Sequence, residues 1–181
     1  MAWRRFTVRP ARRRSSTRRG QTLGRAAREA VIDLADCERG FLLINQPNGP
    51  VVRAWQGLDD RALSAPAFDG SRGAVDKALR ERRPVVVNDA GLDAGFAGRA
   101  SVVAGGLRSL VCLPLATGDQ VLGLAYADSR APGHAITTLE LDLLAAFAER
   151  AALWLAARRS ELALAEVARQ VRWPGATGAA A

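Results

Sequence analysis

The chain has few of the residues from which metal centres and catalytic sites are usually built. Its 181 residues include one His and two Cys. Cys37 and Cys112 are 75 positions apart, so no spacing of His and Cys gives a tetrahedral zinc site. Without a secretory signal, two distant Cys are expected to be reduced thiols. The composition therefore excludes zinc modules and disulfide scaffolds, and no metal site is predicted.

A hydrophobic run long enough to cross a bilayer, which takes ~20 residues, is also missing. The start, Trp3-Arg4-Arg5-Phe6, resembles a twin-arginine export signal. An Arg- and Ser-rich stretch follows, however, where such a signal needs apolar residues. We therefore expect a cytoplasmic protein without a membrane partner.

Acidic residues are missing from the first part of the chain. Residues 1–21 contain eight of the 26 basic residues and no acid, which leaves 18 basic against 18 acidic residues elsewhere. The net charge of +8 thus belongs to this segment, and nucleic-acid binding is not expected except through it. Residues 1–21 and the Gly- and Ala-rich residues 173–181 are predicted to be disordered tails.

What the chain does contain is a set of periodic apolar segments. Residues 22–37 repeat apolar side chains at the helical period, after Thr22 as a possible N-cap. Ser71 is predicted to cap a second helix that runs to about Arg82, just before Pro84.

Two pairs of apolar runs, each joined by a turn sequence, predict two β-hairpins, and a β-branched run predicts one more strand. Two hairpins separated by a helix favour an α+β fold with an antiparallel sheet over an α/β fold. The irregular stretches are where a compact domain often keeps its function. The predicted strands are 41–44, 51–55, 85–87, 109–115 and 121–127, and the irregular stretches are 58–70, 88–106 and 128–136.

A long helix is predicted from about Thr138 to about Arg172. At 35 residues it would span about 52 Å, well beyond the ~30 Å of a small domain. Its second half must project, break or pack on a partner, and the near-heptad spacing of its apolar residues suggests a coiled-coil seam. The predicted dimer seam is Leu144, Ala148, Ala151, Leu155 and Leu162. The alternative is that residues 137–157 only pack on the sheet and the remainder frays.

Three stretches, taken in order, resemble the GAF domain family. They are Ala35-Asp36-Cys37-Glu38-Arg39-Gly40-Phe41-Leu42-Leu43, Arg83-Pro84-Val85-Val86-Val87-Asn88-Asp89-Ala90, and Gly106 to Leu115 followed by Val121-Leu122-Gly123 and Tyr126-Ala127-Asp128-Ser129. The resemblance covers roughly residues 22–160, so residues 161–172 would be a helical extension. It implies a sheet of five or six antiparallel strands, with the first and last helices on one face and often paired across a dimer.

The same resemblance implies a ligand pocket on the opposite face, under the irregular loops. The candidate ligand-binding residues are Trp55, Phe68, Phe96, Ser101, Arg108, Ser109 and Tyr126. Arg108 would suit an anionic group, which a guanidinium can bind through two hydrogen bonds. The alternative for Arg108 is a structural ion pair with Asp89 or Asp128.

No catalytic motif stands out, and no signature of a haem- or bilin-binding member is present, so the cofactor is left open. The only His, His134, is expected at the surface. Members that reduce free methionine sulfoxide use several Cys in the pocket loops, whereas this chain has none between residues 38 and 111.

The sequence therefore predicts a non-catalytic, small-molecule-sensing and dimerisation domain of a bacterial signal-transduction protein. Its output partner would be a kinase or a transcription regulator. Two alternatives remain, a ligand-free dimerisation or protein-interaction module and a thiol-dependent methionine sulfoxide reductase.

Overall fold

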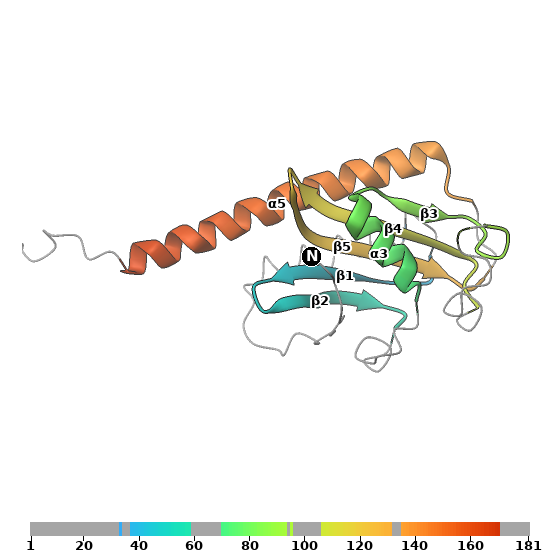
Figure 1. The fold of residues 1–181 in the computed structure, drawn as a ribbon, viewed down its shortest axis with the longest axis horizontal. Helices are drawn as coiled ribbons and strands as arrows, with labels where there is room; N and C mark the ends of the chain where they lie inside the picture. Colours follow the sequence, from blue (N-terminus) through green and yellow to red (C-terminus); the bar gives the residue numbers. More distant parts are fainter. Residues whose placement is uncertain are drawn as a thin grey trace, which may run out of the picture.

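The computed structural model describes residues 33, 37–58, 70–93, 95, 106–131 and 135–170. Both predicted tails and most of the predicted helix 22–37 lie outside these residues. The described part contains five strands and two helices (Figure 1). They are β1 (Arg39–Gln46), β2 (Gly49–Gln56), α3 (Arg72–Glu81), β3 (Val85–Val87), β4 (Ser109–Thr117), β5 (Gln120–Ser129) and α5 (Thr138–Gln170).

The strands form one antiparallel sheet in the order β2-β1-β5-β4-β3, as the hairpin pattern predicted. β1 and β5, which are far apart in the chain, lie side by side at its centre. The register places one row of side chains across all five strands. This row is Trp55, Phe41, Tyr126, Cys112 and Val85.

A helix covers each face of the sheet, and this sandwich creates two cores (Figure 1). On one face α3 packs through Ala74, Val75, Ala78 and Leu79, and we call this side the α3 face. On the other, the α5 face, the helix lies over β4 and β5. Strand side chains alternate between the two faces because successive Cβ atoms point to opposite sides.

Both described helices begin at a side-chain cap. The hydroxyl of Ser71 accepts a hydrogen bond from the Ala74 amide at 3.2 Å, which confirms the predicted cap. For α5, the Thr137 hydroxyl accepts from the Glu140 amide at 3.3 Å, and the Glu140 carboxylate accepts from the Thr137 amide at 2.8 Å. This reciprocal capping box fixes where the long helix starts.

The predicted loop 128–136 is wrong at its first two residues, because β5 continues through Asp128 and Ser129. Asp128 is paired with Arg39 of β1, and Ser129 is paired with Ser109 of β4. These two polar residues lie buried between neighbouring strands, where the hydrogen-bonding ladder holds them in the sheet.

The apolar packing of the long helix on the sheet ends at Ala156, and residues 161–170 are all exposed (Figure 1). Leu144 and Ala148 are buried against the sheet of their own chain, and Ala151 and Leu155 are partly buried there. Leu162 follows Leu144 by five helical turns, on the same side, but lies beyond the sheet and is 55% exposed. Leu144 and Ala148 are therefore core residues, which corrects their place in the predicted dimer seam.

Replacing Leu144 by Ala should lower the free energy of unfolding by about 2–5 kcal/mol, because a fully buried side chain leaves a cavity. The matched control, Leu162→Ala on the same side of the helix, should cost only about 0.5 kcal/mol. Urea unfolding followed by far-UV circular dichroism measures both. Equal costs would contradict the division of α5 into a packed half and a projecting half.

Candidate functional site

Three separate parts of the chain meet at the end of β5. The Ser71 amide donates to the Tyr126 hydroxyl at 3.0 Å, where the chain enters α3. The Arg108 amide donates to the Ser129 carbonyl at 2.9 Å, where it enters β4. Arg39, at the start of β1, forms an ion pair with Asp128. The last four residues of β5 thus hold the chain ends that border residues 59–69 and 96–105.

The ion pair between Arg39 and Asp128 is buried, with the side chains 8% and 1% exposed. The guanidinium binds both carboxylate oxygens, and the Arg39 Nη2 to Asp128 Oδ2 distance is 3.3 Å. Tyr126 also donates a hydrogen bond to this carboxylate. Burial raises the pKa of Asp128, and the hydrogen bonds from Arg39 and Tyr126 oppose that rise.

Tyr126 connects this ion pair to the row of side chains that crosses the sheet, which we call the aromatic row because it contains Trp55, Phe41 and Tyr126. Its ring stacks on Phe41, with 5.0 Å between the ring centroids and 19° between the planes. Burial, and then the nearby charge of Asp128, raise the pKa of Tyr126 well above 10.0. The phenol is therefore a neutral group with both hydrogen-bonding functions in use at neutral pH.

The structure brings together only some of the predicted ligand-binding residues. Trp55 and Tyr126 share one row on the α3 face, where Trp55 is partly buried. Ser109 is buried, but it lies on the α5 face. Side chains along a strand alternate between the two faces, and Val111, two residues on, belongs to the α5-face core. Phe68, Phe96, Ser101 and His134 lie outside the described residues.

Arg108 is exposed, although its backbone is held on both sides. Its amide donates to Ser129, and its carbonyl accepts from the Ala90 amide at 2.7 Å. Neither ion pair suggested for it is present in the described part of the chain, because Asp128 binds Arg39 and Asp89 accepts from the Gly91 amide at 2.9 Å. Arg108 thus presents a cation from a fixed backbone position.

Asn88 is a residue that the sequence did not single out. Its side chain accepts from the Ile136 amide at 2.8 Å and donates to the Ile136 carbonyl at 3.2 Å. These two hydrogen bonds join the loop after β3 to the segment just before α5. Nothing in the sequence marks it, since the two residues are 48 positions apart and Asn is an ordinary loop residue.

A family model described as "GAF domain" matches residues 19–155. The chain belongs to the GAF domain family. GAF domains are generally regulatory sensory modules. A search of curated proteins gave no match.

Solved GAF structures share this fold. The domain of a putative two-component sensor histidine kinase from Sinorhizobium meliloti 1021 has a TM-score of 0.58 and 21% identity, covering 82% of this chain and 97% of that one. The second GAF domain of DevS from Mycobacterium smegmatis has a TM-score of 0.57 and 19% identity, covering 79% and 97%. The GAF domain of PixJ from Thermosynechococcus elongatus, in its blue-light-absorbing form, has 0.57 and 19%, covering 86% and 96%.

The two thiols of this GAF domain lie on opposite faces of the sheet. Cys112 is fully buried in the α3-face core, and Cys37 is buried in the α5-face core. Burial, and then the charge of Asp128, raise the pKa of the Cys112 thiol. A nucleophilic Cys needs accessible thiolate, so the environment of Cys112 disfavours the thiol-dependent reductase.

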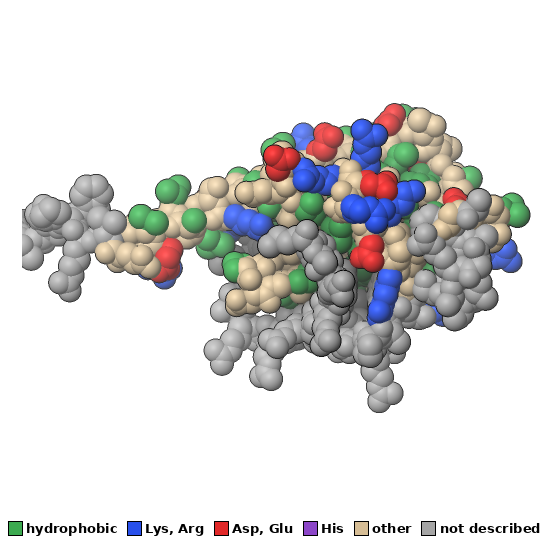
Figure 2. Space-filling model, in the orientation of Figure 1, with side chains coloured by type: hydrophobic (Ala, Val, Ile, Leu, Met, Phe, Trp, Pro, Cys, Tyr) green, Lys and Arg blue, Asp and Glu red, His purple; other side chains and the backbone are tan. Residues whose placement is uncertain are grey.

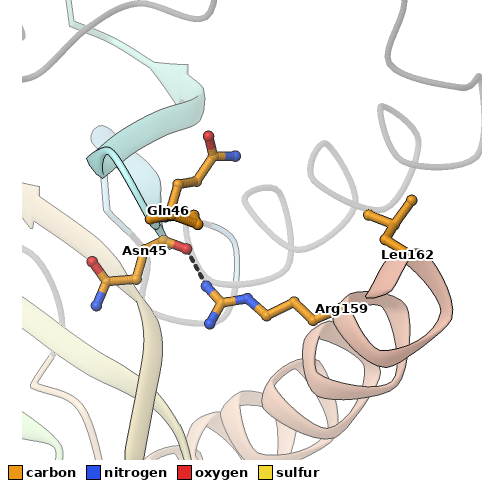
Figure 3. A pocket seen from close by; sticks show the side chains of 5 residues that line it. Asn45, Gln46, Arg159 and Leu162 are labelled. Atoms are coloured by element: carbon orange, nitrogen blue, oxygen red, sulfur yellow. Dashed lines mark hydrogen bonds between the residues drawn. The ribbon is translucent and has the colours of Figure 1, made fainter. Parts of the chain in front are cut away.

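Elsewhere, an open hollow lies between the β1–β2 turn and α5 (Figure 3). Its lining residues are Asn45, Gln46, Pro47, Arg159 and Leu162. The Arg159 side chain crosses the hollow, donating to the Asn45 carbonyl and, at 3.3 Å, to the Leu122 carbonyl. This arginine attaches α5 to the sheet at the point where the helix begins to project.

Among the residues that the structure describes, no cluster of His, Cys, Asp and Glu is arranged to hold a metal ion. None of the described helices combines the length and the apolar character required to cross a membrane.

Removing one partner of the buried ion pair should be costly. Arg39→Met leaves the Asp128 carboxylate buried and is expected to lower stability by about 3–5 kcal/mol. The double variant Arg39→Met/Asp128→Leu should recover part of this loss, because no uncompensated charge remains. As a control, Asp119→Asn removes an exposed ion pair with Arg82 and should change stability little. A single variant as stable as the native chain in urea would contradict this.

Tyr126 is the only tyrosine, so tyrosinate absorbance reports on it alone. Its raised pKa means that the folded chain keeps this proton as the pH passes 10.0, whereas the unfolded chain releases it. The unfolded state then binds fewer protons, and stability should fall as the pH rises above 10.0. Tyr126→Phe should reduce this alkaline slope. Tyrosinate absorbance near pH 10.0 in a chain that is still folded would show the assignment to be wrong.

Proposed function

We propose that this GAF domain is a non-catalytic sensory module that binds a small molecule carrying an anionic group on its α3 face. Arg108 is the observation on which the proposal rests. Its guanidinium is exposed and forms no ion pair among the described residues, and its backbone is fixed at both peptide groups. Such a preorganised cation suits a carboxylate or phosphate.

The surroundings of Arg108 fit a binding site on this face. Trp55, the partly buried member of the row that contains Tyr126, offers apolar surface on this face, and small-molecule sites combine such surface with a few placed polar groups. Ser71 and Arg108, which follow residues 59–69 and 96–105 in the chain, are both held by the last four residues of β5. The remaining candidates, Phe68, Phe96 and Ser101, belong to these two stretches of the sequence.

A short path of hydrogen bonds connects Arg108 to the long helix. The Arg108 carbonyl holds the Ala90 amide, and Asn88, two residues earlier, holds both backbone groups of Ile136. Thr137, the cap of α5, follows directly. A ligand that moves Arg108 would therefore pull on the start of α5, and α5 would pass the change to a second copy of the domain in a homodimer.

We place this module in the cytoplasm, in a bacterial signalling pathway whose output is a kinase or a transcription regulator. One of the similar structures is a domain of a putative two-component sensor histidine kinase. The second candidate is a ligand-free interaction module. It is favoured by the close packing under α3, where Tyr126 is 1% exposed and its hydroxyl is already bonded.

Native mass spectrometry of the purified chain, followed by denaturation, separates the two candidates. We expect a dimer that carries a stoichiometric anionic molecule, and Arg108→Gln should cut its occupancy by more than about half, in line with loss of a charged contact. The matched control is Arg53→Gln, an exposed arginine on β2. Chains that never carry a molecule would support the interaction module, and equal occupancy in both variants would remove Arg108 from the site.

A further inference from the structure

The hollow between the β1–β2 turn and α5 lies apart from the site at Arg108. Its volume is about 540 Å³, within the ~300–1,000 Å³ of most small-molecule sites. The Arg159 side chain in it reaches the Leu122 carbonyl of β5, whereas Arg108 is held by Ser129 at the other end of that strand. Seven residues of extended chain separate Leu122 from Ser129 by about 23 Å. A ligand in the hollow would therefore be distinct from one bound at Arg108.

Two carbonyls that Arg159 binds lie where the strand ladders stop. The β1–β5 ladder ends one residue before Asn45, and the partner of Asn45 on β2 is Pro50, which has no N–H to donate. On β5, Leu122 is the extra residue of a β-bulge and has no opposite residue on either neighbouring strand. Arg159 donates to both carbonyls in place of a strand partner. This end of the sheet thus fixes the guanidinium in the hollow.

Arg159 differs from other basic residues of the molecule because it has no acidic partner among the described residues. Figure 2 shows Lys and Arg side chains next to Asp and Glu side chains over α3, and Arg158, directly before Arg159, pairs with Glu161 at 2.8 Å. None of the five residues that line the hollow is acidic. A guanidinium binds a carboxylate more strongly than a neutral carbonyl, because the acceptor is charged. The hollow therefore favours a ligand that brings a carboxylate.

The other residues of the hollow suit a short apolar chain behind that carboxylate. Leu162, 55% exposed, supplies apolar surface on α5, and Pro47 supplies it on the β1–β2 turn. Figure 3 shows Asn45 and Gln46 on one side of the Arg159 side chain and Leu162 on the other. Small-molecule sites combine apolar walls with a few placed polar groups in this way.

We propose that the hollow is a second ligand site, which takes a small monocarboxylate with a short apolar chain. The carboxylate binds Arg159 in place of the long contact, 3.3 Å, with the Leu122 carbonyl, and the chain lies against Leu162 and Pro47. Arg159 attaches α5 to the sheet where the helix begins to project, so occupancy of the hollow changes that attachment. The site goes beyond the proposed function, which uses the opposite end of β5.

Titration with isocaproate in chloride buffer at constant ionic strength tests the site by two-dimensional proton–nitrogen NMR. The Arg159 Nε–H and the Gln46 side-chain amide should shift together and saturate, with a dissociation constant of about 1–10 mM for so small a ligand. Isocaproamide, which has the same chain without the charge, should bind at least about tenfold more weakly. Equal affinity for the acid and the amide would overturn the proposal.

Two neighbouring arginines give a matched pair of variants. Arg159→Gln should raise the dissociation constant of isocaproate at least about tenfold, because the charged donor is lost. Arg158→Gln, which removes only the partner of Glu161, should leave it within about twofold. Far-UV circular dichroism checks that both variants keep the native helix content. Two variants that bind alike, or an Arg159 resonance that does not move at ~50 mM isocaproate, would overturn the site.

The wall and the other cation complete the test. Leu162→Ala should weaken isocaproate binding about three- to tenfold through lost apolar contact. Arg108→Gln should leave the binding unchanged, because Arg108 lies at the other end of β5. Isocaproate binding that is lost in Arg108→Gln and kept in Arg159→Gln would assign the acid to the α3-face site and overturn the hollow. A chain that retains no molecule in native mass spectrometry removes the proposed function and leaves this titration as it stands.

Discussion

The ion pair between Arg39 and Asp128 lies where β1 meets β5, and two charges are tolerated inside a protein only when both are well paired. Asp128 also accepts from Tyr126, whose hydroxyl in turn accepts from the Ser71 amide at the start of α3. One residue beyond Asp128, Ser129 holds the amide of Arg108. The central strand pairing, the entry to α3 and the backbone of Arg108 are therefore all held at this buried contact or at the residue next to it.

The two faces of the sheet differ in the residues that they carry. The α3 face carries the row of Trp55, Phe41 and Tyr126 and the buried ion pair, whereas the α5 face is an apolar surface on which the long helix packs. Asn88 and Ala90 connect them around the end of the sheet. A perturbation on one side can thus reach the other without passing through the tightly packed centre, which deforms little.

Local patterns were enough to predict the strands, the cap at Ser71 and the length of the last helix, because period, turn residues and capping are encoded by neighbours in the chain. The side of the sheet or of the helix on which a residue lies was harder to predict. Ser109 lies on the α5 face, whereas the site proposed here is on the α3 face, since one step along a strand changes the face. In α5, Ala and Leu fill two opposite stripes with the same spacing, and only the sheet distinguishes the stripe of Leu144 from that of Leu143. The pairings of Arg39 and Asn88 depend on long-range register, which one sequence does not reveal.

The continuity of α5 gives the helix a rotational phase. From the cap at Thr137 to Gln170 there is no break, so each residue turns the helix by about 100°. Whatever is attached beyond Gln170 inherits an angular position set by the number of intervening residues. Adding seven residues restores that angle to within about 20°, whereas adding two turns the attachment to nearly the opposite side. In any chimaera built on this domain, linker length in whole heptads would preserve the geometry of the output, and a change of two or five residues would turn the output by roughly 140–160°.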